Sequence, residues 1–547
     1  MSINVALSGL TTYQRALETT SHNITNVATE GYSRQRVDLS ARTPEYIGVG
    51  FLGKGVQAIA VERVYDQFLQ NQVNNRTSSF NDHSTYYDIA SQLDSVLGDS
   101  SIGLTSALEG FFNSIQDVAS NPTSIPARQV VLSQADTLST RFQTINQQIE
   151  DLRVNVNSQM SVMVSDINNL AQSIADLNTE IVRASGQAGG GSPNDLLDQR
   201  DRLITKLSEY TNVSTNEQSD RSVNVFIGSG QALVLGSSYN TMAVLNDDFD
   251  VQSRQIAFVN SGVNIPITEQ LSGGKLGGLI DVKTEVLDSA QNSLGRIAIA
   301  FATDFNAQHQ LGDDLSGTAG GLFFTDIGSS SPLVLPNTNN NAASGNFSIT
   351  IDDVNALQPS DYRLSYDGAN YTMLRMSDNS VVYSGAAVPG TLASEGITLS
   401  LTGSVSAGDS FMVRPTRYAA GQTGVQITDP AKIAAAATGT ASGNNENALS
   451  LAALQTTRNM AGGTASFQEA YGMVVANVGV KTNQAGIAKD SQKVLLDQAL
   501  ESRNAVSGVN LDEEAANLIK YQQAYQAAAQ LVSIDDQLFQ TLLGAVS

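Results

Sequence analysis

The sequence of 547 residues has no cysteine, no tryptophan and three histidines. Without cysteine the chain forms no disulfide and offers no thiolate for catalysis or metal binding. His22, His83 and His309 are too far apart in the sequence to match the spacing of a metal motif. We therefore expect no metal site and no cofactor, and we interpret each histidine as structural or exposed.

Charged residues are scarce too. They make up 15% of the chain, and the formal net charge is −23. Because phosphate binding needs clustered Lys and Arg, this balance argues against nucleic acid and against an anionic membrane as partners. The ordinary interpretation of the acidity is solubility.

Long apolar runs are absent as well. No stretch of about 18 apolar residues exists, so we expect no membrane span. The start, MSINVALSGLTTYQRALETT, has neither a basic region nor an unbroken apolar segment, so we expect no cleaved signal peptide. If the protein is exported from the cytoplasm, we expect export without cleavage of the chain.

At both ends of the chain, apolar residues recur with the spacing of an α-helix. Steps of three and four residues connect them, which is the spacing that selects another helix as partner. An apolar stripe more often packs within its own domain, but these stripes lie at the chain ends, which need an anchor. We predict subunit packing by Ile3, Leu7, Leu10, Leu17, Ile24, Leu518, Tyr521, Tyr525, Val532, Phe539 and Leu542.

The interior alternates between helical and strand-like regions. Apolar residues in steps of three or four predict a helix over about 127–184, roughly 85 Å long at ~1.5 Å per residue. A second helix follows over 194–210, and residues 213–272 and 320–420 read as strands. Asp367-Gly368 predicts a hairpin turn. Asn510 and Glu513 predict a capping box that begins a C-terminal helix.

These regions predict a multidomain protein with helices and strands. We expect terminal coiled-coil helices, a domain made of a bundle of long helices, and an inserted all-β outer domain. The predicted boundaries are 1–60 with 500–547 for the terminal domain, 61–320 with 435–499 for the helical rod with a small β insertion at 213–272, and 321–434 for the outer domain.

No pattern of catalytic residues stands out. GVGFLGKG (48–55) resembles a phosphate loop, but Gly55 occupies the place of the hydroxyl residue and a strand-like run follows. Adjacent aspartates in strands point to opposite faces and are poor acid–base partners. We therefore predict that the protein is not an enzyme.

Several segments resemble the axial proteins of the bacterial flagellum. At the ends these are ALSGL (6–10), SHNITNVATEGYSRQ (21–35) and GVNLDEEAANLIKYQQAYQAAAQLV (508–532). The interior segments NPTSIPARQVVLSQADTL (121–138) and NDLLDQRDRLITKLSEY (194–210), with the serine of GYSRQ, are similar to the hook-associated protein 1 family.

This resemblance implies a structural subunit at the hook–filament junction. It implies export uncut to the extracellular flagellum, with a dedicated flagellar export chaperone on the C-terminal helical region. It also implies contacts with the hook protein and the second junction protein, a ring of about eleven copies, and terminal helices that are disordered in the free monomer.

Other classes remain as alternatives. Another flagellar axial protein (the second junction protein, a hook protein or a flagellin-like protein) would share the terminal segments. A signalling coiled-coil receptor would need a membrane span. A secreted hydrolase would need converging acidic, histidine or serine residues within 320–420.

Overall fold

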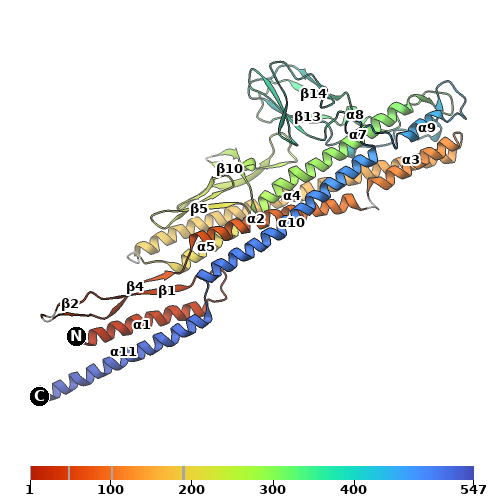
Figure 1. Ribbon diagram of the computed structural model, residues 1–547. Helices are drawn as coiled ribbons and strands as arrows, with labels where there is room; N and C mark the ends of the chain where they lie inside the picture. The colour runs from red at the N-terminus through yellow and green to blue at the C-terminus, as the bar shows by residue number, and fades with distance from the viewer. Residues whose placement is uncertain are drawn as a thin grey trace.

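The longest element is α4 (Ile125–Gln187), which spans 63 residues and follows the long axis of an elongated molecule (Figure 1). The prediction of a helix over 127–184 is confirmed, with two or three further residues at each end. Its apolar seam from Leu138 to Ile181 is buried, except that Leu152, Met163 and Leu170 are half-buried. The computed structural model describes residues 2–46, 48, 50–99, 103–187, 191–260 and 262–546.

Shorter helices pack around α4 and complete the rod. They are α2 (Gln67–Gly98), α3 (Leu104–Ser120), α5 (Asn194–Ser208), α6 (Gly274–Val282), α7 (Ser289–His309), α9 (Glu446–Ala453) and α10 (Phe467–Ser507). A π-helical segment, Lys283–Asp288, joins α6 to α7. Phe111 of α3 lies at the centre of an aromatic cluster, with ring centroids 5.1–6.1 Å from Phe301, Phe305, Phe323 and Phe324.

The two chain termini lie together at one end of the rod (Figure 1). There α1 (Ser2–Thr25) packs against α11 (Leu511–Val546). A hairpin arm lies on another side of α1. We use this name for four strands, β1 (Gln35–Ala41) paired with β4 (Val56–Arg63), and β2 (Glu45–Tyr46) paired with β3 (Phe51–Leu52).

A small β-rich region lies along α4. It contains a four-stranded sheet in the order β5-β6-β7-β8 and a three-stranded sheet in the order β11-β10-β9. The strands are β5 (Val213–Glu217), β6 (Val223–Ile227), β7 (Gln231–Leu235), β8 (Ser238–Tyr239), β9 (Thr241–Asn246), β10 (Arg254–Asn260) and β11 (Val263–Pro266), and η1 (Thr268–Gln270) follows.

A second β-rich region projects sideways from the rod (Figure 1). It contains a five-stranded sheet, β13-β20-β15-β16-β17, and a three-stranded sheet, β14-β19-β18. The strands are β13 (Leu333–Pro336), β14 (Asn346–Ile351), β15 (Tyr362–Tyr366), β16 (Tyr371–Arg375), β17 (Ser380–Gly385), β18 (Thr391–Leu392), β19 (Ile397–Thr402) and β20 (Ser410–Arg414).

The predicted hairpin at Asp367-Gly368 joins β15 to β16. The Asp367 carboxylate accepts hydrogen bonds from the backbone N–H of Ala369 and of Asn370, and Gly368 has a φ of 100°. Short elements connect this region to the rod: β12 (Gly312–Asp313), α8 (Ile327–Ser330), η3 (Ala420–Gln422), η4 (Pro430–Lys432) and β21 (Ala436–Ala437). The predicted fold class, helical ends with a β-rich middle, is confirmed.

Candidate assembly interface

The terminal helices α1 and α11 lie antiparallel. The rings of Tyr13 and Tyr521 stack with centroids 6.4 Å apart. A Cβ atom added to Gly9 would lie 3.4 Å from the Cβ of Ala528, so the two backbones approach closely there. In this register Ser2 lies opposite residues near 535, so the last turns of α11 extend beyond the start of α1 (Figure 1).

The predicted packing residues divide into two groups. Leu10, Leu17, Ile24, Leu518, Tyr521 and Val532 are half-buried. The others remain exposed: Ile3 by 47%, Leu7 by 54%, Tyr525 by 36%, Phe539 by 61% and Leu542 by 64%. Apart from Tyr525, the pair within one chain covers the inner members of each predicted seam and leaves the outer members open.

The fully buried face of α1 is one that the seam did not predict. It consists of small and polar side chains in steps of three and four. These residues are Ala6, Gly9, Thr12, Ala16, Thr20 and Asn23. Small residues let the backbones of α11 and the hairpin arm approach α1, and their helical spacing was the signal that could have found them.

The segment after α1 is fixed by Asn23, which is 1% exposed. Its amide donates to the carbonyl of Gln35 at 2.8 Å and accepts from the N–H of the same residue at 2.9 Å. Tyr32 donates its hydroxyl to the Asn23 side chain at 2.8 Å. Gly31 has a φ of 72°, and a side chain there would collide with Arg202. These contacts hold the turn that returns the chain into β1.

Three segments singled out in the sequence meet at this turn. The backbone N–H of Ser33 donates to Asp198 of α5 at 2.9 Å, and Arg63 of β4 contacts Asp198 at 3.0 Å and Asp201 at 2.6 Å. The N–H of Arg34 donates to the carbonyl of Ser507, the last residue of α10, at 2.8 Å. The turn therefore joins the terminal helices to the rod.

The C-terminal helix is also tied to this turn. Asn510 caps α11, since its side chain accepts from the N–H of Asp512 at 2.9 Å and of Glu513 at 3.4 Å. The predicted reciprocal contact of Glu513 is not made, because its carboxylate forms an ion pair with Arg34 instead. The cap of α11 therefore doubles as a link to the N-terminal turn.

Asp198 is 3% exposed, and burial raises the pKa of its carboxyl, while hydrogen bonds from Ser33 and the charge of Arg63 oppose the rise. Burial also raises the pKa of Tyr32, and nearby carboxylates add to this, so its hydroxyl stays protonated and remains a donor to Asn23. The junction is thus a set of partnered, buried polar groups that specify one geometry.

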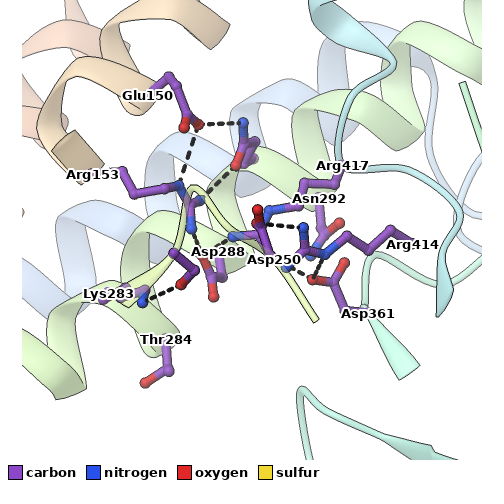
Figure 2. A network of polar contacts seen from close by, with 12 residues as sticks. Glu150, Arg153, Asp250, Lys283, Thr284, Asp288, Asn292, Asp361, Arg414 and Arg417 are labelled. Atoms are coloured by element: carbon purple, nitrogen blue, oxygen red, sulfur yellow. Dashed lines mark hydrogen bonds and ion pairs between the residues drawn. The ribbon is translucent and has the colours of Figure 1, made fainter. Parts of the chain in front are cut away.

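A second polar cluster connects the rod to both β-rich regions (Figure 2). Asp288, at the end of the π-helical segment, accepts from Arg153 of α4 at 2.5 Å and from Arg417. Arg417 also pairs with Asp361, just before β15. Arg414, the last residue of β20, donates to Asp250 between β9 and β10 at 2.7 Å.

The charges in this cluster depend on one another. Burial alone raises the pKa of Asp288, but Arg153, Arg417 and Lys283 outweigh it and leave that pKa lowered. Burial lowers the pKa of Lys283, whose ammonium group donates to Ser253 at 2.6 Å. Asp288 is therefore a partly buried carboxylate whose charge is balanced by buried arginines, and the cluster fixes the orientation of the β-rich regions on the rod.

The histidines and the glycine-rich segment have structural roles. His309 is fully buried, its Nε2 accepts from the N–H of Ala434 at 2.9 Å, and Nδ1 therefore carries the proton and donates to the carbonyl of Gly321 at 2.8 Å. His22 lies 3.0 Å from the Tyr32 hydroxyl, and His83 lies on α2. Gly48 to Gly55 lies in the hairpin arm before β4, and position 49 is outside the described residues.

Two observations concern ligands and membranes. Within the described part of the chain, no group of three or more His, Asp or Glu residues could hold a metal ion. Among the same residues, no helix combines the length and apolar character needed to cross a bilayer.

Comparison with protein families matches four parts of the chain. Residues 90–324 match the flagellar hook-associated protein FlgK helical domain, and residues 335–415 match the D2-like domain of flagellar hook-associated protein 1. Residues 3–32 match the flagella basal body rod protein family, and residues 502–545 match the C-terminal family of the flagellar basal body rod proteins FlgEFG.

Comparison with individual proteins extends over the whole chain. Flagellar hook-associated protein 1 of Salmonella typhimurium is 36% identical, with 99% of each chain covered. The protein of the same name from Escherichia coli K12 is 35% identical over 99% of each chain. The solved structure of the flagellar hook junction protein FlgK from Burkholderia pseudomallei is 28% identical, covers 80% of this chain and 100% of its own, and superposes with a TM-score of 0.73. The chain therefore belongs to the flagellar hook-associated protein 1 (FlgK) family.

Proposed function

We propose that the chain is a structural, non-enzymatic subunit that joins the hook to the filament of the bacterial flagellum. One observation carries this proposal: the rod buries its own apolar seam, whereas the paired terminal helices leave the outer members of theirs exposed. The names of the relatives, hook-associated protein and hook junction protein, support the position in the flagellum.

The mechanism is folding on assembly. The ends are mobile during export through the flagellum, and the protein is secreted without a cleaved signal peptide. A flagellar export chaperone holds the C-terminal helical region beforehand. The ends then order as their exposed seams are covered by neighbouring subunits, and the area buried offsets the lost conformational entropy.

The assembled form is a ring of about eleven copies between the hook protein and the second junction protein. Residues 1–60 with 500–547 form the inner terminal domain, residues 61–320 with 435–499 the rod, and residues 321–434 the outer domain. The hydrogen bonds of Ser33 to Asp198 and of Arg34 to Ser507 support this division, because the chain between the terminal helices is joined to the rod at one place.

Deletion of residues 505–547 tests the proposal. In a strain that lacks its own copy of the protein, the truncated chain should be found in the culture medium or in the cell but not on the hook, and filaments should not grow. The purified truncated chain should keep a protease-resistant central rod. Truncated protein that still builds junctions bearing filaments would overturn the proposal.

A further inference from the structure

A groove lies between the start of α1 and the hairpin arm. Its volume is about 440 Å³, and its walls include Leu7 and Thr11 of α1 and Arg42, Leu52 and Lys54 of the arm. Leu7 is 54% exposed and Leu52 44% exposed, so apolar surface in the groove is open to solvent. Phe51 at the tip of the arm is 76% exposed as well, and exposed apolar surface of this kind indicates a binding site for another apolar segment.

The distal end of α11 has the complementary character. Beyond the point where it passes the start of α1, its apolar side chains remain exposed by 51–64%. These are Ile534, Leu538, Phe539, Leu542 and Leu543. Each lies three or four residues from another member of the set, and Leu538-Phe539 and Leu542-Leu543 are adjacent, so together they form one broad apolar face of the helix.

The charges of the two surfaces are complementary as well. From residue 521 to the end, α11 contains Asp535 and Asp536 but no lysine, arginine or histidine. On the groove, Lys54 pairs with Glu45 at 2.9 Å. No ion pair to Arg42 occurs among the residues that the structure describes, which leaves its charge available to an incoming acidic segment.

Thr11 and position 540 cannot meet within one chain. In the antiparallel register, Thr11 faces residues near 525, so position 540 lies about 15 residues further along the axis. At ~1.5 Å per residue this is a separation of roughly 22 Å. The distal end of α11 extends beyond the start of α1 (Figure 1).

We propose that the groove between α1 and the hairpin arm binds the distal end of α11, residues 534–543, from a second copy of this chain. The inference rests on the proposed function, because it names the partner of the exposed terminal seams. The contact joins two different surfaces, so it repeats from copy to copy around a tube. For Thr11 to face position 540 of the second copy, neighbouring copies must be displaced along the rod by roughly 22 Å at ~1.5 Å per residue.

The absence of cysteine from the sequence allows a direct test by disulfide formation. The full-length variants Thr11→Cys and Gln540→Cys are mixed at a concentration at which the chain self-associates, and are then oxidised. Because a disulfide needs Cα atoms within about 7 Å, this pair can form only between two copies. The expected result is a dimer containing one chain of each variant.

Two further variants serve as controls. Gly9→Cys with Ala528→Cys in one chain should form an internal disulfide, because the two Cβ positions lie 3.4 Å apart. Formation of this disulfide would show that α1 and α11 are paired in the purified protein. Ser491→Cys on the exposed face of α10 replaces Gln540→Cys as the matched exposed site. The yield of mixed dimer with Gln540→Cys should exceed the yield with Ser491→Cys at least about tenfold, because binding in the groove raises the effective concentration of position 540 near Thr11.

Charge exchange tests the specificity of the contact. Arg42→Asp in the Thr11→Cys chain, or Asp536→Arg in the Gln540→Cys chain, should each lower the yield of the mixed dimer. Mixing the two altered chains should restore it, since the opposite charges then face each other again. A loss without restoration would mean that the charges do not meet, and would overturn the proposed orientation.

The outcomes separate this inference from the proposed function. If Thr11→Cys alone forms dimers, or if no mixed dimer forms while the internal control disulfide does, the groove does not bind α11 of a second copy. The proposed function would still stand if the deletion of 505–547 abolishes junctions. A truncated chain that still assembles would overturn both.

Discussion

The rod and the terminal helices carry the same kind of apolar pattern but use it differently. In α4 the apolar seam is covered by the other helices of the same chain. In α1 and α11 the outer members of the seam stay exposed, by up to 64% at Leu542. The pattern predicts where a helix needs a partner, and the exposed outer members are the residues that we propose to pack against other subunits.

The polar clusters follow the same division. The cluster around Asp288 joins the rod to the β-rich regions, whereas the junction at Asp198 joins the rod to the terminal helices. Each cluster fixes an orientation, but only the second transmits the position of the terminal helices to the rod.

The largest effect is expected from a large core side chain of the rod. Phe142→Ala should lower the free energy of unfolding by about 4 kcal/mol, because it leaves a cavity in a fully buried site. The matched substitution Phe539→Ala, at a side chain that is 61% exposed, should change it by less than about 0.5 kcal/mol. Urea denaturation of both full-length variants measures the contrast, and equal losses would contradict it.

The next effect concerns the cluster that orients the β-rich regions. Asp288→Asn should destabilise the rod by about 3 kcal/mol, because Arg153 and Arg417 lose their shared carboxylate while remaining buried. Asp497→Asn, in an exposed pair with Lys493, is the control and should cost less than about 0.5 kcal/mol. Thermal unfolding compares them, and an unchanged midpoint for Asp288→Asn would show that the cluster is not needed.

A smaller and more local effect is expected at the junction. Asp198→Ala removes the acceptor of the Ser33 N–H and a partner of Arg63, at a cost of about 2 kcal/mol. Hydrogen exchange should accelerate in α1 and the following turn, with little change in α4. The control is Asp195→Ala, whose side chain is exposed. Uniform acceleration over the whole chain would contradict a junction role.

The smallest effect depends on pH. Burial raises the pKa of Asp82 on α2 to about 7, and Asp281 and Glu285 add to the rise. An unfolded aspartate titrates near ~3.9, so the folded chain binds more protons between these values and stability falls as pH rises from about 4 to 7.

Asp82→Asn should therefore stabilise the rod at pH 8, by about 1–2 kcal/mol after allowance for partial exposure, and have little effect at pH 4. Urea denaturation at both pH values measures this difference. The control Asp88→Asn changes an exposed aspartate of the same helix. A pH dependence that is the same in wild type and Asp82→Asn would refute the assignment.

Much of the fold could be predicted because its signals are local. The apolar steps of three and four residues predicted α1, α4 and α11 nearly to their ends. Asp367-Gly368 predicted a hairpin because the Asp side chain and a glycine with positive φ form the turn themselves. Asn510 predicted the start of α11 for the same reason.

The arrangement of the site could not be predicted from local signals. The segments around Ser33, Asp198 and Ser507 were each singled out, but their contacts connect residues 165 or more positions apart. Glu513 illustrates the limit: its spacing from Asn510 fits a capping box, yet Arg34 competes for its carboxylate. The small-residue face of α1 was missed because the apolar seam beside it has the same spacing.

The central claim is that the exposed terminal seams serve other subunits. A variant with serine at Ile3, Leu7, Phe539 and Leu542 tests it, against a control with serine at four exposed apolar residues of the β-rich regions, Val251, Val263, Ile265 and Val381. The measurement is electron microscopy of junctions and filaments, with urea denaturation of the purified chains. We predict unchanged monomer stability in both, and loss of junctions only in the seam variant. Junctions that form normally with all four seam residues changed would contradict the account.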